Sequence, residues 1–233
     1  MQPKILLVED DETLGFLLKE FLATRGFEVD WAENGAAGLR LFNEKPFDLC
    51  LLDVMMPALD GFTVAELIRQ RRANLPIIFL TAKSLHADVV RGFKAGADDY
   101  LKKPVDEEEL VARIQAVLKR AADNQAGPGP ANPSVYQIGL YIFDSRQGLL
   151  LFNGEQRELT EMESHLLKLL CDRRGQLVQR EFVLQKIWQR NDFLARKSMD
   201  VFIARLRKYL SKDPNVQIVN VHSSGFVLQV EGP

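Results

Sequence analysis

The sequence predicts two domains of different architecture, an N-terminal α/β domain built on a parallel sheet and a C-terminal α+β domain. Three observations support this prediction. The first 120 residues alternate short apolar runs with amphipathic stretches, residues 121–134 are rich in proline and glycine, and hairpin signals begin at residue 135. A chain of 233 residues is long enough for two ordinary domains.

Five apolar runs in the first 120 residues have the length of strands, at Lys4–Val8, Glu28–Ala32, Leu49–Asp53, Ile77–Thr81 and Asp99–Lys102. Amphipathic stretches predict the helices between and after them, at Glu12–Thr24, Ala36–Asn43, Gly61–Arg71, Ala87–Ala95 and Glu107–Arg120. Strands that are apolar throughout are typical of a parallel sheet covered on both faces. Such sheets bind ligands outside the carboxyl ends of their strands.

Residues 121–134 contain three prolines, two glycines and no large apolar side chain. Such a segment buries too little surface to offset the entropy lost on ordering. We therefore predict a flexible linker at 121–134, between a domain at 1–120 and a second domain at 135–233.

The second domain is predicted to combine hairpins with three helices. Thr160 followed by Glu163 is a capping box that opens the first helix, which ends near Leu170. The remaining helices are expected at Arg180–Trp188 and from about Ser198 to Leu210. The expected strands are Tyr136–Phe143, Gly148–Phe152 before an Asn153-Gly154 turn, Val216–Val221 and Phe226–Val230.

Charge differs between the two parts of the chain. Residues 1–133 carry 16 basic and 21 acidic side chains, net −5, whereas residues 134–233 carry 14 and 11, net +3. This asymmetry indicates two tasks, although +3 alone is weak evidence for nucleic-acid binding. No apolar run approaches the roughly 20 residues of a membrane span. The start MQPKILLVEDD lacks the apolar core of a signal peptide. Cys50 and Cys171 stand far apart in apolar runs, as expected of buried free thiols in a reducing compartment, so we expect a cytoplasmic protein.

Polar groups follow four of the predicted strands. Glu9 and Asp10 follow the first, Asp53 ends the third, Thr81 ends the fourth and Lys103 follows the fifth. Clustered carboxylates without histidine favour Mg²⁺. Each group alone has a simpler interpretation as a helix cap, a strand end or a surface lysine. Four matched groups at one edge instead predict a site where an aspartate is phosphorylated.

The segments ILLVEDD, DLCLLDVMMPALDG, PIIFLTA and GADDYLKKP resemble the receiver domain of bacterial response regulators over residues 3–120. The resemblance implies a flavodoxin-like (βα)₅ fold and a sensor histidine kinase as phosphodonor. It implies that Asp53 is the phosphoacceptor, that Thr81 and Tyr100 form a switch pair, that Lys103 contacts the phosphate and that the Lys103–Pro104 bond is cis. The implied Mg²⁺ ligands are Glu9, Asp10, Asp53 and the backbone carbonyl of Met55, while Asp11 lies outside this set and is expected to cap a helix.

The helix expected at Ser198–Leu210 has two contrasting faces. Helical projection places Met199, Ile203, Leu206 and Leu210 on one face, and Lys197, Val201, Ala204, Arg205 and Lys208 on the other. A basic face opposite an apolar one fits the major groove of DNA. The simpler alternative is an ordinary amphipathic helix with a solvated basic face.

The segment from Leu159 to Leu228 resembles the winged-helix effector domain of OmpR/PhoB-type regulators, with the match covering about residues 136–230. The resemblance implies that the third helix enters the major groove and that a wing reaches the minor groove of a DNA operator. Arg205 is then the candidate for base readout, and Lys197 and Arg207 are candidate phosphate contacts. Lys208 is a further DNA-binding candidate, and His222 stands in the wing where arginine is usual.

The resemblance also implies a homodimer on activation, with Asp99 and Arg113 as a salt-bridge pair at its interface, and RNA polymerase as a further partner. The chain as a whole is expected to be a transcriptional regulator controlled by phosphorylation and not a metabolic enzyme. Two alternatives stay open at this point. One is a constitutive DNA-binding protein whose receiver serves only for dimerisation, and the other is a metal-dependent phosphohydrolase or phosphotransferase acting on small molecules.

Overall fold

The computed structural model describes residues 2–82, 92, 95–125, 134–221 and 224–231. The chain divides into two compact units, Met1–Asp123 and Asn124–Pro233, which are described separately below. None of the helices in the described part of the chain combines the length and the apolar character that a membrane crossing requires.

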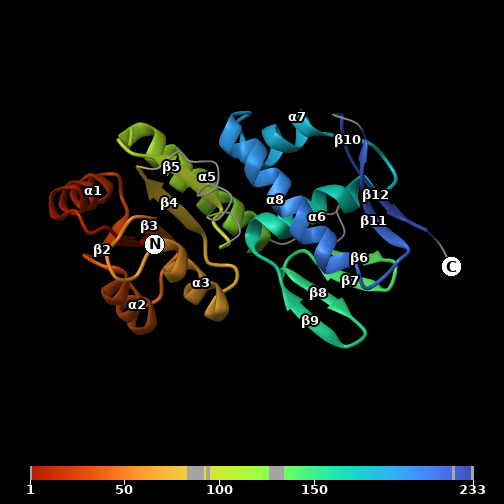
Figure 1. Cartoon of the computed structure of the whole chain (residues 1–233), viewed down its shortest axis with the longest axis horizontal. Helices are drawn as coiled ribbons and strands as arrows, with labels where there is room; N and C mark the ends of the chain where they lie inside the picture. Colours follow the sequence, from red (N-terminus) through yellow and green to blue (C-terminus); the bar gives the residue numbers. More distant parts are fainter. Residues whose placement is uncertain (1, 83–91, 93–94, 126–133, 222–223, 232–233) are drawn as a thin grey trace. The chain divides into compact units, whose positions relative to one another are not determined.

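The first unit is a five-stranded sheet with the strand order β2-β1-β3-β4-β5, in which every neighbouring pair is parallel. The strands are β1 (Lys4–Val8), β2 (Glu28–Ala32), β3 (Leu49–Asp53), β4 (Ile77–Thr81) and β5 (Asp99–Lys102). The described helices are α1 (Glu12–Thr24), α2 (Gly35–Glu44), α3 (Gly61–Arg71) and α5 (Glu107–Gln125). This arrangement (Figure 1) confirms the doubly wound α/β fold expected of a receiver.

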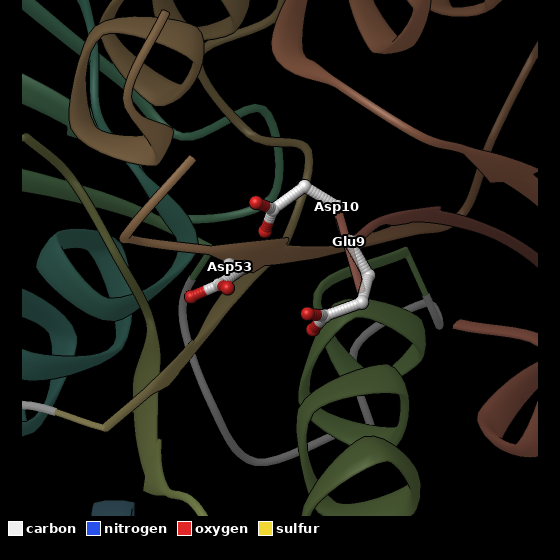
Figure 2. Close-up of side chains that lie close together, drawn as sticks. All are labelled: Glu9, Asp10 and Asp53. Atoms are coloured by element: carbon white, nitrogen blue, oxygen red, sulfur yellow. The ribbon is translucent and has the colours of Figure 1, made fainter. Parts of the chain in front are cut away.

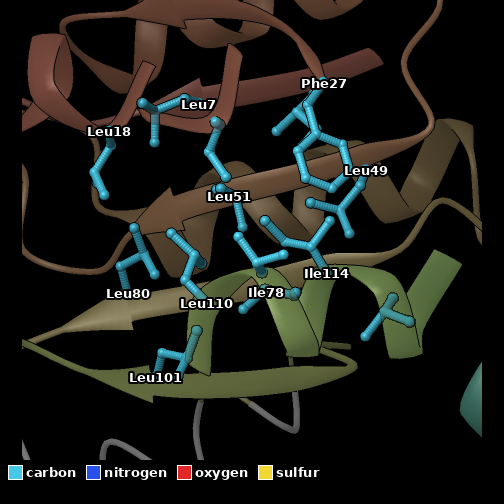
Figure 3. Close-up of a cluster of buried hydrophobic side chains, with 14 residues drawn as sticks. Leu7, Leu18, Phe27, Leu49, Leu51, Ile78, Leu80, Leu101, Leu110 and Ile114 are labelled. Atoms are coloured by element: carbon cyan, nitrogen blue, oxygen red, sulfur yellow. The ribbon is translucent and has the colours of Figure 1, made fainter. Parts of the chain in front are cut away.

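Helices cover both faces of this sheet. On one face, α1 and α5 pack their apolar side chains on alternate residues of the central strands, as Figure 3 shows for Leu18, Leu110 and Ile114 against Leu51 and Ile78. On the other face, α2 contacts β1 and α3 contacts β3. The three central strands are consequently buried along their whole length except for Lys4 at the start of β1, which explains their continuous apolar sequences.

Short polar side chains begin three of the helices. Asp11, Asn34 and Asp60 accept hydrogen bonds from the backbone N–H groups three residues ahead, and so cap α1, α2 and α3. The expectation that Asp11 is a cap is therefore confirmed. Each cap fixes the point where the chain turns from the carboxyl end of the sheet into a helix.

Helix α5 is longer than the sequence predicted. It continues to Gln125, five residues past the expected end at Arg120 and into the segment expected to be a linker. Ala121 and Ala122 are strong helix formers, and the first strong helix breakers of the segment are Gly127 and Pro128. Residues 126–133 of the proposed linker and most of the helix expected at 87–95 lie outside the described residues.

The second unit begins with an antiparallel sheet in the order β6-β7-β8-β9. Its strands are β6 (Val135–Ile138), β7 (Tyr141–Asp144), β8 (Leu149–Phe152) and β9 (Glu155–Glu158). Helix α6 (Glu161–Asp172), the short α7 (Arg180–Val183) and α8 (Phe193–Leu210) follow. A second sheet, in the order β10-β12-β11, consists of β10 (Val178–Gln179), β11 (Val216–Val221) and β12 (Gly225–Val230). Three helices and a C-terminal hairpin confirm the expected winged-helix fold (Figure 1).

Several element boundaries in this unit differ from the prediction. The single strand expected at Tyr136–Phe143 is two strands, because Gly139 takes a φ of +58° and turns the chain. The helix expected at Arg180–Trp188 is α-helical only to Val183 and continues as one π-helical turn, Leu184–Trp188. Helix α8 starts at Phe193, five residues early, because Asp192 caps it.

The core of this unit joins α6, α8 and the second sheet. The apolar face predicted for α8 is confirmed, since Met199, Ile203, Leu206 and Leu210 are all buried. Phe202 is buried as well, with its ring 6.3 Å from that of Trp188. Of the two cysteines, Cys50 is buried as expected, whereas Cys171 is only partly so.

Candidate functional site

Three carboxylates meet at the carboxyl ends of β1 and β3. Asp53 is the last residue of β3, and Glu9 and Asp10 directly follow β1, the neighbouring strand. Their oxygen atoms lie within 4.8 Å of one another (Figure 2). Glu9 and Asp53 are buried and Asp10 is more exposed, so the cluster opens toward solvent through Asp10.

Lys103 supplies a positive charge to this cluster from the segment after β5. Its Nζ lies 2.8 Å from Asp53 Oδ2 and 2.7 Å from Glu9 Oε1. Burial acts to lower the pKa of Lys103, but its hydrogen bonds to Asp53 and Glu9 outweigh burial and raise this pKa above its ordinary value. Lys103 therefore stays charged at neutral pH. Its peptide bond to Pro104 is cis, as the receiver resemblance implied.

Glu9 differs from an ordinary surface carboxylate. Burial raises the pKa of Glu9, the hydrogen bond from Lys103 lowers it, and the nearby charge of Asp53 raises it again, with a net shift upward. Glu9 and Asp53 share the single ammonium group of Lys103, so the cluster has more negative than positive charge. A further cation at this edge would be favourable on electrostatic grounds.

The backbone around Asp53 fixes the direction of its carboxylate. The N–H of Met55 donates a hydrogen bond of 3.0 Å to Asp53 Oδ1. The first residue of α3, Gly61, lies directly against the strand end, and a Cβ atom there would stand 2.0 Å from the carbonyl oxygen of Asp53. The sequence alone did not predict this role of Gly61, although the glycine at the end of the DLCLLDVMMPALDG segment was a visible signal for it.

Thr81 and Tyr100 lie on β4 and β5, beside the acidic cluster in the strand order. Thr81 ends β4 and is buried. Tyr100 is also buried; its ring centroid lies 5.9 Å from that of Phe79 at an angle of 69°. A Cβ atom on Gly92 would lie 2.9 Å from the Tyr100 ring, so the ring fills the space that this glycine leaves. The predicted switch residues are therefore both buried within the domain.

The acidic cluster fits a hard divalent cation. All its available donors are carboxylate oxygens, which is the ligand type of Mg²⁺, and its carboxylates outnumber the single lysine. The Met55 N–H bond to Asp53 brings the backbone of residue 55 next to these carboxylates, as a carbonyl ligand from Met55 requires. The residues present thus suit Mg²⁺ on donor chemistry and charge.

The outward face of α8 consists mainly of polar and basic side chains. Arg196, Asp200, Ala204 and Lys208 are exposed or half-exposed, and Lys197 has its Nζ 5.7 Å above the ring of Phe193. The predicted outer face is therefore present, but two of its features were missed. Arg196 belongs to it, and Asp200 brings a negative charge that pairs with Arg180.

Both arginines expected to contact DNA are bound within the unit. Arg205 Nη1 lies 3.1 Å from Oε1 of Glu163, a buried carboxylate that also closes the capping box of α6 and accepts a bond from Tyr209. Arg207 Nε donates a 2.8 Å bond to the carbonyl of Ile218 on β11. Helical projection places a residue on a face but does not detect such partners from other elements. His222, the predicted wing residue, lies outside the described residues.

The residues expected at a dimer interface contact each other within one chain. Arg113 Nη1 lies 3.1 Å from Asp99 Oδ2, and the same guanidinium pairs with Glu109 one turn earlier on α5. Burial lowers the pKa of Arg113, but Asp99 and Glu109 outweigh burial and raise it. The pair is therefore an intramolecular link between β5 and α5 in the single chain.

Comparison with known proteins agrees with this architecture. Residues 5–115 match the family model of the response regulator receiver domain, and residues 154–228 match that of the C-terminal domain of transcriptional regulatory proteins. The chain is 44% identical over 230 residues to the transcriptional regulatory protein RprY of Bacteroides fragilis, covering 99% of this chain and 96% of the relative. It is 37% identical over 226 residues to TctD of Salmonella typhimurium, covering 97% of each.

Among solved structures, the chain is similar to the response regulator DrrB of Thermotoga maritima, an OmpR/PhoB homologue, with 28% identity, a TM-score of 0.51, and coverage of 98% of this chain and 100% of that one. A receiver with a carboxylate cluster, followed by a winged helix, defines a DNA-binding response regulator of a two-component system. The chain belongs to the OmpR/PhoB-type response regulators and is a transcriptional regulator.

Proposed function

We propose that Asp53 accepts a phosphoryl group from a phosphohistidine of a sensor histidine kinase, and that this reaction controls DNA binding by the C-terminal unit. The observation that carries the proposal is the contact of the Asp53 carboxylate with Lys103, beside Glu9 and Asp10. A receiver domain implies a histidine kinase as phosphodonor, and the winged helix implies DNA as the target.

In the proposed step, an oxygen of Asp53 forms a bond to phosphorus while the bond from phosphorus to the histidine nitrogen breaks. The electron pair of that bond goes to the imidazole ring, which takes up a proton. Lys103 is within reach of Asp53 and can donate to an oxygen of the incoming group, which offsets its negative charge. Glu9, Asp10, Asp53 and the Met55 carbonyl would hold Mg²⁺, which supplies charge neutralisation during the transfer.

The phosphoryl group adds roughly −1.5 to −2 charges and new acceptor oxygens next to β4. The proposed response is that the Thr81 hydroxyl donates to one of these oxygens and that the Tyr100 ring is held in its buried position. The packing of Tyr100 against Phe79 supports this proposal, because it provides a preformed place for the ring. Such a change biases a two-state equilibrium without refolding the domain.

Phosphorylation of the full chain by a small phosphodonor with Mg²⁺ tests the first step. The wild-type chain should gain one acid-stable, base-labile phosphate, and Asp53→Asn should gain none. The matched control is Asp30→Asn, since Asp30 is a surface carboxylate on β2 that pairs with Lys45, and its loss should leave labelling unchanged. Equal labelling of Asp53→Asn and the wild type would refute Asp53 as the acceptor.

For the DNA-binding step, we propose that α8 enters the major groove with the face formed by Arg196, Lys197, Ala204 and Lys208. Lys197 and Lys208 are the proposed phosphate contacts, and His222 is the proposed wing contact. Arg207 would add a phosphate contact only if it released the carbonyl of Ile218. Replacing Lys197 with alanine should weaken binding to all DNA sequences by a similar factor, which binding titrations on specific and random DNA would measure.

Arg205 is the proposed base-reading residue, and its ion pair with Glu163 adds a requirement to this proposal. The guanidinium has to leave a buried carboxylate before it can reach a guanine edge. Arg205→Ala should therefore reduce discrimination between operator and random DNA. If the variant keeps full discrimination but loses thermal stability, Arg205 acts in the packing of α6 against α8 and not in readout.

The proposed dimer on activation would use the face formed by the fourth and fifth receiver helices and the strand between them, β5, with Asp99 and Arg113 exchanging partners between two copies. RNA polymerase is a further proposed partner. The competing function is constitutive DNA binding, with the receiver serving only for dimerisation. The contact of Lys103 with Asp53 favours phosphorylation control. Equal dimer content and equal DNA affinity with and without phosphodonor would favour the constitutive alternative.

A further inference from the structure

Trp31, the fourth residue of β2, is bound to the backbone beside the acidic cluster. Its indole Nε1–H donates a 3.0 Å hydrogen bond to the carbonyl oxygen of Glu9. The N–H of Glu9 in turn donates a 3.1 Å bond to the carbonyl of Ala32, the residue after Trp31. The backbone C=O and N–H groups of Glu9 thus form hydrogen bonds with two consecutive residues of β2, Trp31 and Ala32. The bond from Trp31 reaches the peptide group that leads directly into Asp10.

Gly15 on α1 provides the space that the indole needs for this contact. A Cβ atom on Gly15 would lie 2.4 Å from Trp31 Cε2 and 2.5 Å from Trp31 Nε1, far closer than any real side-chain contact. Any other residue at position 15 would displace the same ring edge that carries the N–H donor. Trp31 also lines an open surface pocket of about 360 Å³ with Asn34 and Arg40. Open space is thus available next to the indole if the ring is displaced.

The residue after Asp10, Asp11, is fixed as well, because its side chain caps α1 at Leu14. Asp10 consequently lies between one peptide bond held by Trp31 and one residue held by a helix cap. Both anchors therefore hold the backbone that carries the Asp10 carboxylate. The cap is a common feature of helix starts, whereas the indole bond depends on the Trp31 and Gly15 pair.

We propose that Trp31 is a positioning residue that orients the Glu9–Asp10 peptide for divalent-cation binding, and that Gly15 permits it. The proposal rests on the Mg²⁺ site proposed above. Groups that orient metal ligands without touching the metal typically change affinity by about 10- to 100-fold when lost. Trp31 acts through the backbone of Glu9, one step further from the metal than such groups, so we expect a smaller change in Mg²⁺ affinity of about threefold to tenfold.

Calorimetric titration of the full chain with Mg²⁺ tests this inference. Trp31→Phe keeps an aromatic ring but loses the donor, and should raise the dissociation constant about threefold to tenfold. The matched control is Trp188→Phe, which loses the other tryptophan donor, bound to Ser198 Oγ at 3.1 Å in the second unit, and should leave Mg²⁺ affinity unchanged. Thermal unfolding without metal shows whether each variant is folded.

A double-mutant cycle with Gly15→Ala separates positioning from general damage to the fold. Gly15→Ala alone should weaken Mg²⁺ binding by a factor similar to that of Trp31→Phe, because it moves the donor. In the Trp31→Phe background it should change the affinity by less than about twofold, since no donor is left to move. Equal effects of Gly15→Ala in both backgrounds would overturn the inference.

Two further outcomes are distinguishable. If the wild type binds Mg²⁺ and Trp31→Phe binds it equally well, the positioning role is wrong and the metal site stands. If the folded wild type binds no Mg²⁺ at millimolar concentration, the proposed metal site fails, and this inference fails with it.

Discussion

Replacing Gly61 with alanine is expected to disable the phosphorylation site by displacing the backbone of Asp53. The added Cβ would lie 2.0 Å from the carbonyl oxygen of Asp53 and 2.9 Å from its carbonyl carbon. Ordinary van der Waals contact begins at 3.4 Å, so moving from 2.0 to 3.4 Å requires a separation of about 1.4 Å between α3 and the end of β3. Neither partner can yield by rotating a side chain, because the backbone of residue 61 fixes the position of the Cβ atom and the Asp53 carbonyl is itself a backbone group.

A displacement of about 1 Å at a reacting group lowers a reaction rate by about 100-fold. We therefore expect Gly61→Ala to reduce the rate of Asp53 phosphorylation by at least about that factor at saturating Mg²⁺. Forcing atoms into a packed interior also lowers the free energy of unfolding by about 1–3 kcal/mol. The assays are the rate of phosphate incorporation from a small phosphodonor and the urea unfolding of the same preparation.

Gly26→Ala is the matched control for the loss of stability. Gly26 has a φ of +87°, and a Cβ atom added there would meet none of the described residues within 4 Å. Alanine at this position therefore adds backbone strain of about 1–2 kcal/mol without a clash. This variant should lose comparable stability and retain the wild-type rate of phosphorylation. A wild-type rate for Gly61→Ala, or an equal loss of rate in both variants, would refute the reasoning from geometry.

Three more predictions concern stability and reactivity. Thr160→Ala removes the capping box that Thr160 forms with Glu163, and should lower the free energy of unfolding by about 1 kcal/mol in urea titrations; an unchanged midpoint would contradict it. Burial raises the pKa of the Cys50 thiol to about 12, so Cys50 stays a neutral thiol at pH 8 and should resist alkylation until the chain is unfolded, as mass spectrometry of the modified peptide would show. Arg69→Ala leaves the fully buried Asp98 without its 2.7 Å partner and should destabilise the first unit by about 3–5 kcal/mol; a loss below about 1 kcal/mol in calorimetry would mean that Asp98 is protonated in the variant.

The sequence predicted the fold of the first unit well because its physical signals are local. Each central strand is an uninterrupted apolar run, and α1, α2 and α3 each have a polar cap at their start. The boundaries in the second unit were harder to predict. The turn at Gly139 depends on Asp213, whose side chain accepts the N–H of Leu140 from 73 residues away. No local pattern reports such a partner.

The same contrast between local signals and long-range partners applies to the candidate site. The groups at the strand ends were predictable, because parallel strands bring their carboxyl ends to one edge. The partners of Arg205 and Arg207 were not, because they come from α6 and β11 and depend on how these elements pack. Trp31 was missed for a similar reason, since its role depends on the missing side chain at Gly15.

The intrachain pairing of Arg113 with Asp99 has a consequence for how ionic strength acts on the protein. If two copies exchange these partners at the proposed interface, the number of ion pairs is the same before and after association. Salt then screens these ion pairs alike in both states, so their exchange should add little to the salt dependence of the dimerisation constant. Binding to DNA releases counterions, and its affinity should fall steeply as salt rises. Raising the ionic strength should therefore weaken DNA binding, while the number of Asp99–Arg113 ion pairs in the dimer stays the same.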